Sequence, residues 1–148
     1  MEYSGSLGEV HIANISDYGG DFLKGKEDGL RYEWHENGQK YFEGIYKDGE
    51  PEGLWTYWFD NGKKISEQIY KDGKPDGKFI EWWENGQKKF EVNFKDEKPD
   101  GLWTYWHDNG NKKSEETYKD GKLDGKWISW NENGQKSEEK TYKDGKEK

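Results

Sequence analysis

The sequence repeats its own pattern every 24 residues, and this period restricts the possible folds more than any other feature of the chain. A short, fixed period is typical of arrays in which small units bury apolar surface only against their neighbours. The pattern predicts an N-terminal cap, partly strand, over 1–23, five repeats over 24–142, and a truncated sixth repeat or polar tail over 143–148. The recurring residues, expected to be structural, are Trp34, Trp58, Trp82, Trp106 and Trp130, followed by Gly38, Gly62, Gly86, Gly110 and Gly134.

Each repeat has the composition of a β-hairpin. An Asn-Gly pair such as Asn61-Gly62 favours a two-residue type I′ turn, in which both central residues have positive φ. The runs 54–59 and 64–70 are typical of strands, and the connection at 71–77 is rich in Gly, Asp and Pro, which favours a turn. We therefore expect an all-β fold, an elongated antiparallel β-meander of 24-residue hairpin repeats with an open-ended sheet.

The turn also predicts how the strands pair. A two-residue loop at Asn61-Gly62 pairs Trp58 with Ile65 and Trp55 with Gln68. On this register the recurring tryptophans form a ladder on one face of the sheet. A second ladder of rings is expected on the opposite face, where cross-strand ring pairs contribute roughly 0.2 to 1 kcal/mol each. It runs through Trp55, Tyr70, Phe79, Phe94, Trp103, Tyr118, Trp127 and Tyr142.

One turn departs from the pattern. Glu97 stands where the equivalent turns have Gly73 and Gly121. We expect either a different turn type or a glutamate held at positive φ, at a cost of about 1 kcal/mol. Replacement of Glu97 by glycine is therefore predicted to stabilise the chain.

Charge and composition exclude several classes of protein. With 24 Lys+Arg against 32 Asp+Glu, the net charge of −8 argues against nucleic acid or a membrane surface as partner. The absence of Cys excludes disulfide scaffolds and cysteine zinc sites. Only 28% of the residues are hydrophobic, but 9 Trp, 10 Tyr and 6 Phe supply enough ring surface for a core.

The sequence contains no convincing catalytic or metal-binding constellation. The three histidines are His11, His35 and His107, and the last two are repeat equivalents too far apart to share a metal. A loop beginning at Asp72 matches an EF-hand only in part, because Lys74 and Trp83 occupy ligand positions. Carboxylates recur in every repeat, which is typical of a solvated β surface. We expect no enzymatic activity, no cofactor and no metal site.

Rings that vary from repeat to repeat are the candidate binding residues. Repeat proteins present a binding face by varying residues on a constant frame, and exposed Trp and Tyr often carry interface energy. On this basis the predicted contact residues are Tyr57, Phe59, Trp83 and Tyr105. The alternative is that these rings belong to the core.

The segment from Asp76 to Lys98 approximates the unit D-G-x-W-x-x-W-x-[DE]-N-G-x-K-x-x-E-x-x-Y-K-D-G-K, with aromatic substitutions and Glu97 in place of one Gly. This unit resembles the MORN-repeat variant of bacterial proteins, which include the YwqK-type antitoxins. The resemblance extends over about residues 24–146. It implies an antiparallel β-meander used for protein interaction, self-association or, in some eukaryotic members, lipid contact.

We therefore expect a non-enzymatic scaffold for protein–protein interaction, with antitoxin- or immunity-like binding of a bacterial partner. An acidic rim favours a basic partner protein. Two alternatives stay open: a cell-wall glycan- or choline-binding module, and a structural protein that forms homo-oligomers through its sheet edges. The first residues have neither a basic start nor an apolar run, so the expected location is the bacterial cytoplasm, with a processed exported chain left open.

Overall fold

The computed structural model describes residues 21–23 and 26–148. The chain divides into two compact units, Met1–Lys74 and Pro75–Lys148, and each is described by itself. Every regular element in the described residues is a β-strand, and this part of the chain holds no helix with the length and apolar character needed to cross a membrane.

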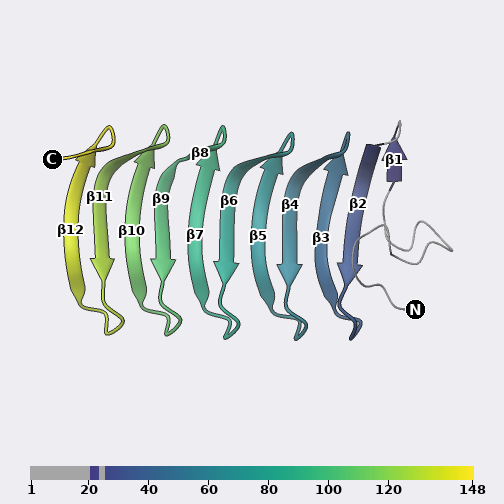
Figure 1. Cartoon of the computed structure of the whole chain (residues 1–148), viewed down its shortest axis with the longest axis horizontal. Helices are drawn as coiled ribbons and strands as arrows, with labels where there is room; N and C mark the ends of the chain where they lie inside the picture. Colours follow the sequence, from purple (N-terminus) through teal and green to yellow (C-terminus); the bar gives the residue numbers. More distant parts are fainter. Residues whose placement is uncertain (1–20, 24–25) are drawn as a thin grey trace. The chain divides into compact units, whose positions relative to one another are not determined.

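Unit 1 is an antiparallel meander in which each strand pairs with the next one along the chain (Figure 1). Residues 1–20 of the predicted cap lie outside the described residues, whereas Asp21–Leu23 pairs with the start of the following strand. The strands are β1 (Asp21–Leu23), β2 (Lys26–Trp34), β3 (Lys40–Lys47), β4 (Glu50–Trp58) and β5 (Lys64–Lys71).

Unit 2 repeats the same hairpin pattern, with a two-residue strand, β8, against the end of β7. The strands are β6 (Lys74–Trp82), β7 (Lys88–Lys95), β8 (Lys98–Pro99), β9 (Gly101–Trp106), β10 (Lys112–Lys119), β11 (Lys122–Trp130), β12 (Lys136–Lys143) and β13 (Lys146–Glu147). The predicted all-β fold, an open antiparallel sheet of 24-residue hairpins, is confirmed.

The Asn-Gly turns are not of the predicted type I′. At Asn61-Gly62 only the glycine has positive φ (84°). The loop spans three residues, since the Phe59 N–H donates to the Lys63 carbonyl at 2.8 Å and the Gly62 N–H donates to the Phe59 carbonyl at 3.0 Å. The Asn61 side chain accepts the Lys63 N–H at 2.9 Å, which favours a type I turn followed by a left-handed glycine.

Type I′ turns occur instead at the other connection of each repeat. Asp72 and Gly73 have φ of 50° and 80°, so both central residues are left-handed. Aspartate tolerates this conformation better than most residues. At the irregular turn the structure keeps the same type and holds Glu97 at φ 67°, which decides between the two expectations for this residue.

The predicted register is correct in the middle of the hairpin and wrong beside the turn. Trp55 pairs with Gln68, as expected, but Trp58 pairs with Lys64 and not with Ile65. The three-residue loop shifts the pairing by one residue, and a bulge between Tyr57 and Trp58 restores it.

The two faces of the strands differ. We call the face that carries Trp55, Tyr57 and their repeat equivalents the aromatic face, and the face that carries Leu54, Thr56, Trp58 and their equivalents the tryptophan face. On the aromatic face of unit 1, Phe42 stacks on Trp55 with centroids 5.4 Å apart, and both rings are buried. Trp55 also meets Tyr70 at 6.2 Å, a contact that the second predicted ladder contains.

In unit 2 the same ladder continues with Trp103, whose ring lies 5.3 Å from Phe94 and 5.0 Å from Tyr118. Val92 is the most deeply buried apolar side chain of this unit. Rings and a few aliphatic groups on the aromatic face therefore form the core of each unit.

Candidate functional site

Two of the predicted contact residues lie in unit 1, and Tyr57 is packed into its aromatic core. Its ring is 5.5 Å from Phe42 and 5.8 Å, edge to face, from Tyr41. Burial raises the pKa of Tyr57 to about 12, with smaller contributions from neighbouring tyrosines and Glu33. Phe59 is half-buried and opens the Asn-Gly loop. The structure therefore gives Tyr57 a packing role, while its role in binding stays a prediction.

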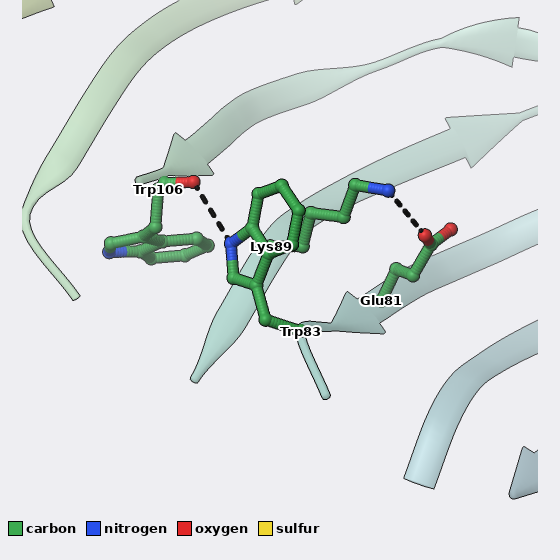
Figure 2. Close-up of polar contacts among 4 residues, drawn as sticks. All are labelled: Glu81, Trp83, Lys89 and Trp106. Atoms are coloured by element: carbon green, nitrogen blue, oxygen red, sulfur yellow. Dashed lines mark hydrogen bonds and ion pairs between the residues drawn. The ribbon is translucent and has the colours of Figure 1, made fainter. Parts of the chain in front are cut away.

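The other two predicted contact residues, Trp83 and Tyr105, also have partners within unit 2. Figure 2 shows the Trp83 indole N–H directed at the Trp106 carbonyl, at 3.3 Å, and Lys89 reaching Glu81, at 2.9 Å. The Lys89 ammonium lies 4.9 Å from the Trp83 ring centroid. Tyr105 packs 6.0 Å from Phe90, and burial together with Glu116 raises its pKa.

The bond that Trp83 donates has counterparts between other consecutive repeats. His35 and His107 are its repeat equivalents, and their Nε2 atoms donate to the carbonyls of Trp58 and Trp130 at 2.8 and 3.0 Å. The acceptor is in each case the ladder tryptophan of the next repeat, 23 residues ahead. From the sequence alone, the two histidines are considered only as metal ligands and Trp83 as a contact residue, whereas a ring N–H is the property that the three share. We call this bond the ring staple.

The asparagine of the Asn-Gly turn makes a second bond between repeats. Asn37 Nδ2 donates to the Asp60 carbonyl at 2.7 Å, and Asn109 Nδ2 donates to the Glu132 carbonyl at 2.8 Å. The Oδ1 atom of each asparagine accepts the N–H two residues ahead within its own turn. Asparagine recurs at this position because the two bonds require a side chain with both a donor and an acceptor, and not because the position has positive φ.

The tryptophan ladder is covered by lysines from the preceding strand. Lys40, Lys88 and Lys112 place their ammonium groups 5.7, 5.7 and 5.8 Å from the ring centroids of Trp58, Trp106 and Trp130. Each of these lysines also pairs with the glutamate three residues ahead, as Lys40 does with Glu43 at 2.9 Å. The recurring Lys, Glu and Trp thus contact one another at these three places, while the structural role of the whole ladder stays a prediction.

The described residues lack a metal-binding cluster and contain a shallow pocket. No group of three or more His, Asp or Glu side chains there is arranged to hold a metal ion. A shallow pocket of about 370 Å³ is lined by His35, Glu36, Asn37 and Asp60, of which His35 and Asn37 also donate the hydrogen bonds between repeats. In unit 2, Glu116 accepts hydrogen bonds from the Tyr118 hydroxyl at 2.7 Å and the Trp127 indole at 3.3 Å.

Sequence reasoning missed a row of exposed aliphatic side chains on the tryptophan face of unit 1. The row takes one residue from each of β2 to β5, and its members Leu30, Ile45, Leu54 and Ile69 are 41, 46, 51 and 37% exposed. Leu30 is opposite Ile45 and Leu54 is opposite Ile69 in the strand pairing. The signal in the sequence was that, of the six unit 2 residues at these repeat positions, only Leu102 is aliphatic; the others are Lys78, Asn93, Thr117, Lys126 and Thr141.

Comparison with known proteins identifies the repeat. No curated protein matches the chain. The MORN repeat variant matches five consecutive segments that together cover more than half of the chain: 27–48, 51–72, 75–96, 99–120 and 123–144. Each matched segment includes the strands and the Asn-Gly turn of one hairpin. The chain therefore belongs to the MORN repeat variant family and is a β-hairpin repeat scaffold.

Proposed function

We propose that the protein is a non-enzymatic scaffold that binds a partner protein. The observation that carries this proposal is a constant frame whose exposed residues change along the chain. Lysine, glutamate and tryptophan recur in every hairpin, and Lys40, Lys88 and Lys112 each pair with a glutamate and lie over a tryptophan of the ladder. By contrast, exposed Leu54 and Ile69 in unit 1 are replaced by lysine, asparagine or threonine in most repeats of unit 2. Such variation on a rigid frame is how repeat proteins acquire a specific binding surface.

The ring–lysine contacts favour a protein partner over choline. Aromatic sites for quaternary ammonium groups need a ring face that the ligand can cover. Here the lysines Lys40, Lys88 and Lys112 already lie over three rings of the tryptophan ladder. A choline group would have to displace one of these ammonium groups and break its ion pair with glutamate.

The test is crosslinking of the tagged full-length chain in a lysate of its source organism, followed by reconstitution with the purified candidate partner. Native mass spectrometry is expected to find a complex of fixed stoichiometry with one protein. Saturable binding to choline or cell-wall polysaccharide without a protein complex would contradict the proposal. A mass that rises with concentration in the purified chain alone would favour self-assembly instead.

The four predicted contact residues require substitutions that preserve packing. Serine at Tyr57 would remove a ring from the core, so loss of binding would not separate contact from folding. Tyr57→Phe and Tyr105→Phe keep the rings and remove only the hydroxyls. Weaker binding of the reconstituted partner by these variants, at unchanged stability, is the result expected if the aromatic face contributes to the interface.

At a finer level we propose antitoxin- or immunity-like binding, in which the acidic chain occludes a basic partner in the cytoplasm of a bacterium. The net charge of −8 supports a basic partner. Expression of the identified partner alone is then expected to arrest growth, and co-expression of this chain to restore it. Growth that is unaffected by the partner would contradict the antitoxin proposal and leave the scaffold proposal standing.

A further inference from the structure

We propose that the aliphatic row of unit 1, formed by Leu30, Ile45, Leu54 and Ile69, binds a basic amphipathic segment of the partner protein. The inference rests on the proposed function and specifies its surface and the chemistry of its ligand. These four aliphatic side chains are 37 to 51% exposed, in a chain with few aliphatic residues. Contiguous exposed apolar side chains bordered by polar groups mark interaction sites.

The geometry of the row suits an apolar ligand. Its members come from the neighbouring strands β2, β3, β4 and β5 and form the cross-strand pairs Leu30–Ile45 and Leu54–Ile69. Side chains at such paired positions lie roughly 5 Å apart, so each pair presents an aliphatic surface. Between the two pairs the register of β3 and β4 shifts, and Ile45 is opposite Glu52, two residues before Leu54. The antiparallel pairing of these strands holds the row in place.

Charge beside the row selects a basic ligand. Glu52 is the strand partner of Ile45, and its carboxylate accepts the Asp72 N–H at 2.7 Å. Asp28, its repeat equivalent beside Leu30, accepts the Asp48 N–H at 3.3 Å. Among the described residues, no ion pair to Lys or Arg joins either of these two carboxylates. In unit 2 the equivalent Asp76 accepts the Asp96 N–H at 3.2 Å in the same way, but it lies two residues before Lys78 and not before a leucine. The equivalent Asp124 pairs with Lys143 at 3.0 Å, which lowers the pKa of Asp124.

The distribution of net charge between the two units also favours a basic ligand at the row. Residues 1–74 contain 9 Lys+Arg and 15 Asp+Glu, whereas residues 75–148 contain 15 and 17, so unit 1 has −6 of the net −8. A second copy of the chain would bring the same negative charge against the row. A segment with apolar residues on one side and Lys or Arg beside them can pack its apolar residues on the row and pair its cations with the neighbouring carboxylates.

The probe is a synthetic peptide with leucines on one side and lysines on the other, and the control peptide has glutamate in place of every lysine. The test variant is Ile45→Thr/Ile69→Thr, which introduces the residue that the chain itself has at Thr117 and Thr141. The matched control is Leu102→Thr, because Leu102 is 54% exposed but has Thr117 opposite it. Circular dichroism of both variants verifies the fold.

We expect the wild-type chain and Leu102→Thr to bind the lysine peptide equally, and the double variant to bind it about tenfold more weakly or worse, because two partly buried aliphatic side chains lose their contact with the peptide. The glutamate peptide is expected not to bind. Equal affinity of the double variant, equal loss in Leu102→Thr, or equal binding of both peptides overturns the inference. Self-association of the wild type that the double variant loses also overturns it, in favour of a second copy.

Different results would contradict the scaffold function and the binding role of the aliphatic row. If a reconstituted partner protein binds the double variant as well as the wild type, the scaffold function stands and the aliphatic row is not its binding surface. If no partner protein forms a complex, the function itself is wrong.

Discussion

Glu97 is the residue at which the chain departs from its own repeat, and the structure holds it at φ 67° in a type I′ turn. Gly73 and Gly121 occupy this position elsewhere at φ 80° and 82°. A side chain at positive φ costs about 1 kcal/mol relative to glycine. We therefore predict that Glu97→Gly raises the free energy of unfolding by about this amount, measured by urea denaturation.

A control separates backbone strain from the loss of a charge. Glu84 is exposed in an Asn-Gly loop and lies outside the positive-φ residues. Glu84→Gly is expected to lower stability slightly, because glycine adds freedom to the unfolded chain. Stabilisation by both substitutions, or by neither, would contradict the account of Glu97.

Tyr57 makes a second prediction at the scale of one residue. Burial raises its pKa to about 12, whereas the unfolded chain has a tyrosine pKa near 10. The folded state therefore favours the neutral phenol, and this contribution to stability is complete below pH 10 and falls as the pH rises towards 12. We predict that Tyr57→Phe reduces the alkaline loss of stability.

Urea unfolding at pH 8 and pH 11, chosen to bracket the onset of this titration, measures the effect. Tyr70, Tyr105 and Tyr118 have raised pKa values as well, so both proteins lose stability in alkali. The contribution of Tyr57 is the difference between the two losses. Identical losses in wild type and Tyr57→Phe would show that its phenol titrates normally.

At the scale of the hairpin, the ring staple is one of the contacts between consecutive repeats, and it forms where its position holds His35, Trp83 or His107. Phe59, at the same repeat position, has no ring N–H to donate. His107 donates to the Trp130 carbonyl at 3.0 Å, and Trp83 makes the same bond with its indole. His107→Phe removes the donor and is predicted to destabilise unit 2 by about 0.5 to 1.5 kcal/mol. His107→Trp keeps a ring N–H and is expected to retain most of the stability.

Hydrogen exchange of unit 2 together with urea denaturation checks this prediction. The decisive comparison is between the two variants, since both replace histidine by a larger or comparable ring. Equal stability of His107→Phe and His107→Trp would assign the role of this position to ring packing and not to its N–H.

The hairpins, the ladder of tryptophans and the central register could be predicted because the period and the alternation of the strands define them. The turn types could not, since Asn-Gly and Asp-Gly both fit a type I′ turn and the side-chain bond of Asn61 decides between them. The ring staple and the aliphatic row could not be predicted either, because both depend on which residues of different strands lie side by side in the folded chain. Trp83 and His107 differ in size and charge, and their shared bond is visible only once the next repeat is in place.

At the scale of the whole molecule, two units built from one repeat differ in surface chemistry. The aliphatic row lies in unit 1, which has the larger share of the negative charge. In unit 2, Leu102 is the exposed leucine, and its opposite residue is Thr117. A repeat array with this distribution is expected to bind its partner through unit 1.

The most direct test is methyl NMR of the full chain with labelled leucine and isoleucine, titrated with the basic leucine–lysine peptide or with the purified partner. Few residues of these two types occur in the sequence, so single substitutions can assign the signals. The account predicts that the methyl groups of Leu30, Ile45, Leu54 and Ile69 shift together while those of Leu102, Leu123 and Ile128 stay in place. Shifts confined to unit 2, or shifts spread equally over both units, would contradict it.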